Sequence, residues 1–163
     1  MTLAEAAAQA DGLAQAGSER ELAQLRSQWD DELEAAARSA DYRERAVAYR
    51  AIGQFRFRQK LELLRRGLDD DSPACRGSAL ISLELMSRDH PGDVNAERPL
   101  LHRIVSDREE NAAVRRLAVV CLRNGSPQRE TVTILEGVAA DDEDRELRAA
   151  AKRVAELLKK KGR

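Results

Sequence analysis

The sequence predicts an all-α protein built from helical hairpins. Three observations lead to this prediction: a composition rich in helix formers, apolar residues that recur at the helical period, and arginines that recur at a nearly constant interval. Charged residues make up 35% of the chain and aromatic residues only 3%. Alanine, leucine, arginine and glutamate favour helices, and the residues that favour strands are scarce.

An arginine near the start of each of four apolar segments marks the interval. The segments YRERAVAYRAIG, CRGSALISLELM, VRRLAVVCLRNG and LRAAAKRVAELL align on four landmark arginines: Arg43, Arg76, Arg115 and Arg148. These arginines are 33, 39 and 33 residues apart, and an alanine follows each by three positions: Ala46, Ala79, Ala118 and Ala151. Such an interval is typical of stacked helical repeats.

Two helices are expected before the first repeat. Residues 3–16 form a short helix that Gly17 ends, and Ser18 with Glu21 matches a capping box that opens a longer helix. The apolar stripe of this second helix consists of Leu22, Leu25, Trp29, Leu33 and Ala36. We expect the first repeat to cover the stripe, so that these helices cap the array. If it stays uncovered, the stripe favours association.

Each arginine-marked segment is expected to be the second helix of a hairpin. Apolar residues at the helical period form one face of the third and fourth segments: Val114, Leu117, Ala118, Cys121 and Leu122, then Leu147, Ala150, Ala151, Val154, Ala155 and Leu158. The preceding helices carry their own stripes: Phe57, Leu61, Leu64 and Leu68; Leu101, Ile104 and Val105; Val132, Leu135, Val138 and Ala139.

Capping residues, glycines and prolines predict where these helices begin and end. Ser72 and Pro73 suit the N-cap and first turn of the second arginine-marked helix. Gly53 and Gly125, each ten residues after an arginine, are expected to end helices. Pro91–Gly92 is expected to mark a loop. The acidic turns DDDSP, SDREEN and ADDED complement the positive N-terminal end of the helix that follows each one.

This pattern of helix, acidic turn and arginine-plus-alanine helix resembles HEAT-like repeats of the short bacterial type. DSPACRGSAL and AAVRRLAVVCL are the most similar stretches, and the resemblance covers roughly residues 20–158. It implies a right-handed αα-superhelix with N-terminal capping helices. We therefore expect a single domain over residues 1–163: an N-terminal helix at 1–17, about four helical-hairpin repeats at 18–158 and a basic tail at 159–163.

No recognised catalytic or metal-binding motif is present, so we expect neither an enzyme nor a cofactor. Phosphate loop, dinucleotide fingerprint, HExxH and paired CxxC are all missing. The two histidines, His90 and His102, do not share a helical face, and we expect neither to bind a metal. Cys75 and Cys121 are expected to be buried free thiols.

The charge and the N-terminal sequence suggest where the protein acts. A net charge of −1 gives no overall attraction to nucleic acid or anionic lipid, and no segment is long and apolar enough to cross a membrane. The first residues show neither a basic leader nor a continuous apolar core, so no secretory signal is expected. We expect a cytoplasmic, monomeric protein.

The leading hypothesis is a non-catalytic module, an adaptor, regulatory subunit or inhibitor, that binds another protein on its concave inner-helix face. The inner helices carry apolar residues off their core stripes, and these either pack between helices or line a groove: Leu80, Ile81, Val119 and Val120. The expected partner-binding residues are charged: Arg50, Arg56, Arg58, Glu84, Arg116, Arg123 and Arg153. The landmark arginines are expected to be structural and to pair with acids of adjacent turns.

The alternative is a nucleic-acid-binding protein. Between Arg43 and Arg66 the chain carries eight basic and two acidic residues, with Phe55 and Phe57 among the arginines. Arginines bind phosphates and aromatic rings stack on bases, but here we favour the explanation that the phenylalanines pack at a helix start while the arginines are solvated. HEAT-like alkylpurine DNA glycosylases show that the resemblance permits DNA binding. Short HEAT-like repeats also occur in phycobilin lyase subunits, but no chromophore-handling cysteine or histidine site is evident.

Overall fold

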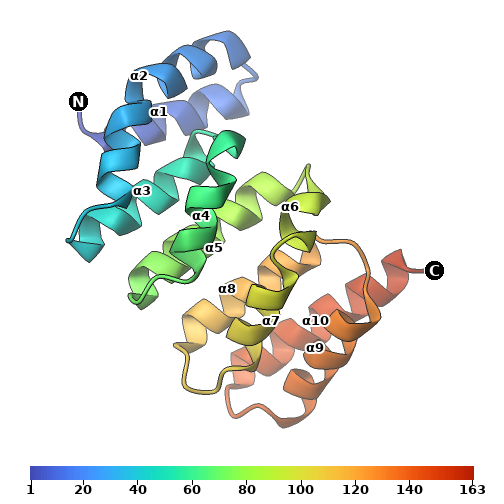
Figure 1. Cartoon of the computed structure of the whole chain (residues 1–163). Helices are drawn as coiled ribbons and strands as arrows, with labels where there is room; N and C mark the ends of the chain where they lie inside the picture. The colour runs from blue at the N-terminus through green and yellow to red at the C-terminus, as the bar shows by residue number, and fades with distance from the viewer. The chain divides into compact units, whose positions relative to one another are not determined.

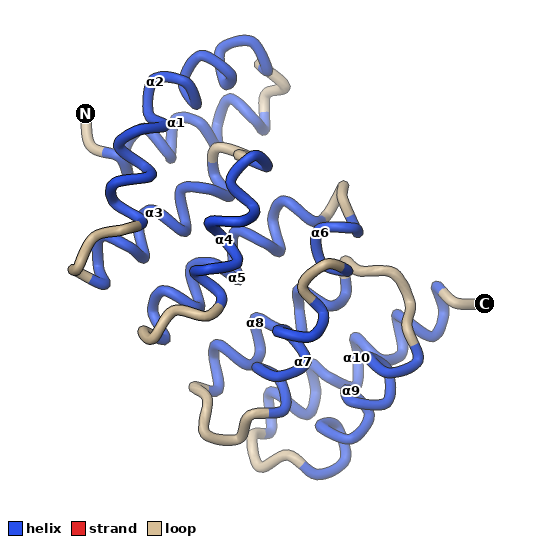
Figure 2. Tube along the Cα trace, in the orientation of Figure 1, coloured by secondary structure: helices blue, strands red, loops and turns tan.

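The computed structural model describes residues 1–163, and every regular element in it is helical (Figures 1 and 2). Ten α-helices and one 3-10 turn follow one another along the chain, without a strand. The predicted all-α fold class is therefore confirmed. No helix combines the length and the apolar composition that crossing a bilayer demands.

The helices belong to two compact units, Met1–Met86 and Ser87–Arg163. The first unit contains α1 (Leu3–Gln15), α2 (Glu19–Ala37), α3 (Tyr42–Gln54), η1 (Arg58–Lys60), α4 (Leu61–Leu68) and α5 (Pro73–Ser87), whose last residue reaches the boundary. The second contains α6 (Pro91–Asn95), α7 (Arg98–Ser106), α8 (Ala112–Arg123), α9 (Arg129–Asp141) and α10 (Arg145–Lys161).

In the first unit, α1 packs against both α2 and α3 (Figure 1). It begins with a capping box that sequence inspection missed, in which the Thr2 hydroxyl accepts a hydrogen bond from the Glu5 amide and the Glu5 carboxylate accepts one from the Thr2 amide. It ends just before Gly17, whose φ of 74° suits glycine, as predicted. Leu22 and Leu33 of α2 are 1% and 0% exposed, so most of the predicted stripe is covered within the unit.

The capping box predicted at Ser18 and Glu21 is wrong. Ser18 does occupy the N-cap of α2, but its side chain makes no capping hydrogen bond. An N-cap side chain reaches the free amides when its residue has an extended backbone, and Ser18 has a ψ of 65° instead. The short link after Gly17 sets this conformation, because the Glu19 amide already donates to the Gly17 carbonyl.

Helices α3 and α5 approach so closely at Gly53 that no side chain fits there. A Cβ on Gly53 would lie 2.6 Å from the Cα of Ser82. The Ser82 hydroxyl accepts a hydrogen bond from the Gly53 amide and lies within hydrogen-bond distance of the Tyr49 and Arg50 carbonyls. The prediction that Gly53 ends a helix is therefore wrong, since α3 continues through it to Gln54. Gly125 does follow the end of α8, as predicted.

The second unit consists of the hairpins α7–α8 and α9–α10, with α10 also packed against α8. The apolar face predicted for α10 is buried in full. The prediction of a loop at Pro91–Gly92 is wrong, because these residues begin the short helix α6. Proline is accepted at the first position of a helix, where its missing amide would have had no partner.

Replacing Gly53 with alanine is expected to destabilise the protein. The new methyl group would overlap the Ser82 backbone, which cannot rotate away, so α3 and α5 must separate. Overpacking of this kind costs about 1–3 kcal/mol. Gly12 is the matched control: it lies inside α1 with no atom near its position for a Cβ, so Gly12→Ala should stabilise by about 0.5–1 kcal/mol. Urea unfolding of both variants measures the difference, and equal effects would contradict the close approach.

Candidate partner-binding surface

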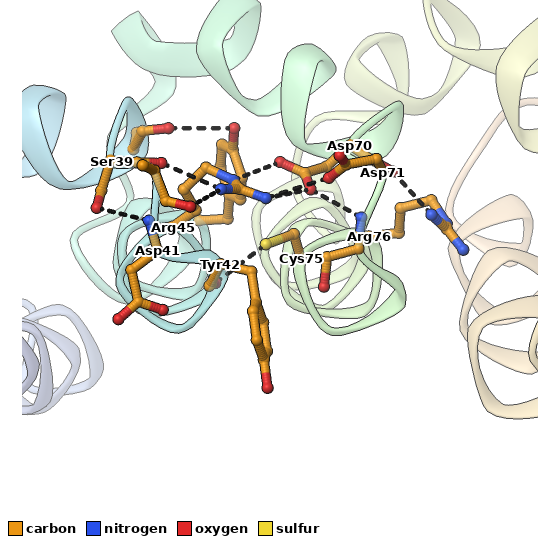
Figure 3. Close-up of polar contacts among 12 residues, drawn as sticks. Ser39, Asp41, Tyr42, Arg45, Asp70, Asp71, Cys75 and Arg76 are labelled. Atoms are coloured by element: carbon orange, nitrogen blue, oxygen red, sulfur yellow. Dashed lines mark hydrogen bonds and ion pairs between the residues drawn. The ribbon is translucent and has the colours of Figure 1, made fainter.

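A network of arginine and aspartate side chains joins α3 to the turn before α5 (Figure 3). Nε and Nη2 of Arg45 donate to the two carboxylate oxygens of Asp70 at 2.9 and 3.0 Å, and Nη1 donates to the carbonyls of Ser39 and Ala40. The Asp70 carboxylate also accepts from the Ser72 amide, and the Asp70 carbonyl accepts from Arg76 Nη1 at 2.7 Å. Through this one aspartate, two arginines and the start of α5 are tied together.

The second unit contains the same network between α8 and the turn before α10. Arg115 donates to the Asp142 carboxylate at 2.6 Å and, through Nε and Nη2, to the Val105 carbonyl. The Asp142 carboxylate accepts from the Asp144 amide, and the Asp142 carbonyl accepts from Arg148 Nη1. Arg115, Asp142 and Arg148 thus correspond to Arg45, Asp70 and Arg76, although Arg45 holds its aspartate through two nitrogens and Arg115 through Nη2 alone.

This match corrects the alignment of the first repeat. The arginine equivalent to Arg115 is Arg45, whereas Arg43 has a 78% exposed side chain that contacts its neighbours Asp41 and Tyr42. The alanine three residues later is then Ala48, which is fully buried, and not the half-buried Ala46. YRER offers two arginines, and only their surroundings in the fold distinguish the buried one.

The pKa values of the two aspartates, Asp70 and Asp142, are shifted in the same direction. Burial alone would raise the pKa of Asp70 and Asp142. The hydrogen bonds from Arg45 and Arg115 and from the backbone outweigh burial and hold the pKa of each carboxyl below its usual range. Both carboxylates are thus ionised at neutral pH, which is the form that an arginine stabilises.

Much of the basic run from Arg43 to Arg66 is also used inside the first unit. Lys60 binds Asp30 and Glu34 at 2.6 and 2.8 Å, and its ammonium lies over the ring of Phe57. Phe55 and Phe57 are buried, so they pack and are not available for stacking on bases. Residues 1–86 together carry 12 basic and 15 acidic side chains. The run therefore presents much less free positive charge than its sequence suggests.

Arg56, one of the residues expected to bind a partner, connects α1 to the end of α3. Its Nη1 donates to Asp11 at 2.8 Å and to the carbonyls of Gly53 and Gln54. Its backbone has a φ of 51°, a left-handed conformation that is uncommon for residues other than glycine. These contacts identify a positioning role within the fold that the sequence did not reveal.

The other expected partner-binding residues divide between the units. Arg50 lies on α3, Arg58 begins η1 and Glu84 lies on α5. In the second unit the expected residues lie on α8 and α10, where Arg116 pairs with acids at the start of α10, the Arg123 carbonyl accepts from Lys161 and Arg153 is exposed. Apart from Arg58, these residues lie on arginine-marked helices, within two separate units.

Arg50 differs from the other cations because its Nη1 is buried and has no hydrogen-bond partner. The residue as a whole is half-buried. Two large apolar residues on the same pair of helices are open to solvent: Val47 of α3 is 41% exposed and Ile81 of α5 is 36% exposed. A guanidinium nitrogen without an acceptor and two exposed aliphatic side chains are features that the internal packing does not use.

An open apolar groove of about 730 Å³ runs beside Val47. It is formed by the start of α1, the end of α2 and the start of α3, and its lining consists of Thr2, Leu3, Ala4, Glu32, Ala35, Ala36, Arg43, Glu44 and Val47. Most of these side chains are small or aliphatic. The groove can therefore receive apolar side chains, and Glu32, Arg43 and Glu44 are its charged lining residues.

Of the remaining candidates for chemistry, three are buried and one is exposed. Cys75 and Cys121 are free, buried thiols, and burial raises the pKa of Cys75, whose sulfur lies 3.2 Å from the Tyr42 carbonyl. His102 is buried against Thr131 and His90 is exposed. No group of three or more His, Cys, Asp or Glu residues is arranged to hold a metal ion.

No protein-family model, no curated protein and no solved structure matches this chain.

Removing Arg115 is expected to destabilise the second unit strongly. The side chains of Arg115 and Asp142 are 5% and 3% exposed, and loss of one partner leaves the other charge buried without compensation. Arg115→Met should lower the free energy of unfolding by about 3–5 kcal/mol. The double variant Arg115→Met, Asp142→Leu should recover much of this loss, because neither charge remains. Chemical denaturation of the parent protein, of Arg115→Met and Asp142→Leu singly, and of the double variant gives the coupling energy, and additive effects would argue against a direct pair.

His102 is expected to make stability depend on pH near neutrality. Its Nε2 is 2.8 Å from the Thr131 hydroxyl, which donates to Gln128, and burial lowers the pKa of the imidazole below 6.5. The unfolded chain therefore binds the proton more readily than the folded one, and stability falls as the pH drops from roughly 7.5 to 5.5. His102→Asn should flatten this dependence, as followed by thermal melts. His90→Asn, at an exposed position, should leave it intact.

Proposed function

We propose that the chain is a HEAT-like repeat protein of the right-handed superhelix class and acts as a non-catalytic module that binds another protein. The recurrence of one hydrogen-bond network, Arg45–Asp70–Arg76 and Arg115–Asp142–Arg148, supports a repeat origin. Repeat scaffolds of this kind present extended surfaces to partners. The free buried cysteines fit a reducing compartment such as the cytoplasm.

The observation that carries this proposal is the contrast between two sets of residues on the same helices. Arg45 and Arg115 form ion pairs inside their own units, with Asp70 and Asp142 respectively. Val47, Arg50 and Ile81 are not used in this way, since two expose aliphatic side chains and the third has an unsatisfied nitrogen. Exposed aliphatic residues beside a cation are the composition of a protein-binding surface, in which an apolar centre is bordered by polar groups.

Affinity capture tests the proposal. The tagged chain is expected to retain a stoichiometric protein from lysate of its source cells, and retention should survive nuclease treatment. Ile81→Asp places a charge on the proposed surface at an exposed position and should abolish capture without loss of folding. Arg20→Glu, on the exposed side of α2, is the matched control and should capture normally. Retention that nuclease removes would establish the nucleic-acid alternative instead.

A further inference from the structure

We infer that the apolar groove formed by α1, α2 and α3 takes the end of α10 from a second copy of this chain. This association goes beyond the proposed function, because it joins two copies of the protein and requires neither Arg50 nor Ile81. Its basis is the match between two surfaces, one in each unit. Each surface combines an exposed aliphatic side chain with unpaired charges of one sign, and the two signs are opposite.

The groove of about 730 Å³ is the receiving surface. Its lining is mostly small or aliphatic and includes Val47, which is 41% exposed. Two of its three charged lining residues, Glu32 and Glu44, are exposed, and neither makes an ion pair or a side-chain hydrogen bond within the chain. The third, Arg43, already pairs with Asp41. The groove therefore combines an apolar lining with two unpaired negative charges.

The end of α10 carries the complementary pattern. Leu157 is 42% exposed and is the only large apolar residue of the second unit that is open to solvent. Arg153 lies four residues before it and Lys160 three residues after it, and these spacings place the three side chains on one face of the helix. Arg153 and Lys160 are exposed, and neither has an ion pair or a side-chain hydrogen bond within the chain. This face therefore presents one aliphatic side chain with two unpaired positive charges.

An amphipathic helix that lays one face into a groove is a recurring mode of protein recognition. Pockets of this volume hold drug-sized ligands, so the groove has room for several side chains of a helix. In the inferred contact, Leu157 and the aliphatic lining of the groove leave water together. The two cations of the helix face then approach the carboxylates of Glu32 and Glu44.

The net charges of the two units favour the same contact. Residues 1–86 carry 12 basic and 15 acidic side chains, whereas residues 87–163 carry 16 basic and 14 acidic ones. Unlike units of two copies therefore attract each other, and like units repel. A contact between two different surfaces leaves one groove and one α10 unoccupied in a pair of copies, so further copies can add. One helix face buries little area, so the contact is weak and the dilute chain is the monomer expected from its sequence.

Charge reversal followed by mixing tests the inference. In sedimentation velocity of the full chain, the average mass should rise between micromolar and millimolar concentrations. The groove variant Glu32→Lys, Glu44→Lys and the helix variant Arg153→Glu, Lys160→Glu should each raise the dissociation constant roughly tenfold, because each attraction becomes a repulsion. Mixed in equal amounts, the two variants should associate as the parent protein does, since opposite charges face each other again.

Further variants separate this contact from a general effect of charge and from the proposed function. Glu21→Lys, Glu109→Lys changes the net charge as much as the groove variant does, at exposed positions outside the groove, and should associate like the parent protein. Leu157→Asp should abolish self-association and still capture the partner protein. Ile81→Asp should lose capture and still self-associate.

Three outcomes would overturn the inference: a parent chain that stays monomeric throughout this range, self-association that Leu157→Asp leaves intact, and mixed variants that fail to associate. A monomeric chain whose groove variant loses capture would make the other protein the occupant of the groove. Self-association as inferred, together with no captured partner, would overturn the proposed function alone.

Discussion

The pairing of a helix arginine with the aspartate of the following acidic turn is the interaction on which the rest of the structure depends. In each unit, one aspartate accepts from an arginine of the preceding arginine-marked helix, caps the turn through a backbone amide and offers its carbonyl to a second arginine. An ion pair this well buried is stable only when its hydrogen bonds are complete, and here they are. The geometry of the turns fixes where each following helix begins.

Residues that form the arginine–aspartate networks are not available for other contacts, and residues outside the networks are. Arg45 and Arg115 face the acidic turns and use their guanidinium groups in hydrogen bonds to those turns, so they are not available to bind a partner. Further along α3, the Nη1 atom of Arg50 has no hydrogen-bond partner, and Val47 of α3 and Ile81 of α5 are open to solvent. The residues of the internal networks and the solvent-exposed residues lie on the same helices, so under the proposed function the former can stay constant while the latter set the specificity for a partner.

The helices and their buried faces could be predicted because apolar residues recur at the helical period throughout the chain. Contacts between helices could not, because they depend on which side of a helix a polar residue lies. Arg43 and Arg45 both precede the first apolar segment, and only the position of Asp70 selects Arg45. Gly53 looks like a helix terminator in sequence and is in fact a point of close helix packing. Among the residues expected to bind a partner, Arg56 is an internal connector between α1 and the end of α3, and the exposed Val47 was not recognised from the sequence.

Hydrogen–deuterium exchange of the full chain, with and without the captured partner protein, tests the central claim most directly. The account predicts that binding protects the backbone of α3 around Val47 and Arg50 and of α5 around Ile81. Exchange in the acidic turns at residues 69–72 and 141–144 should stay unchanged, since those turns are already held by arginine. Protection confined to the acidic turns, with none on α3 and α5, would contradict it.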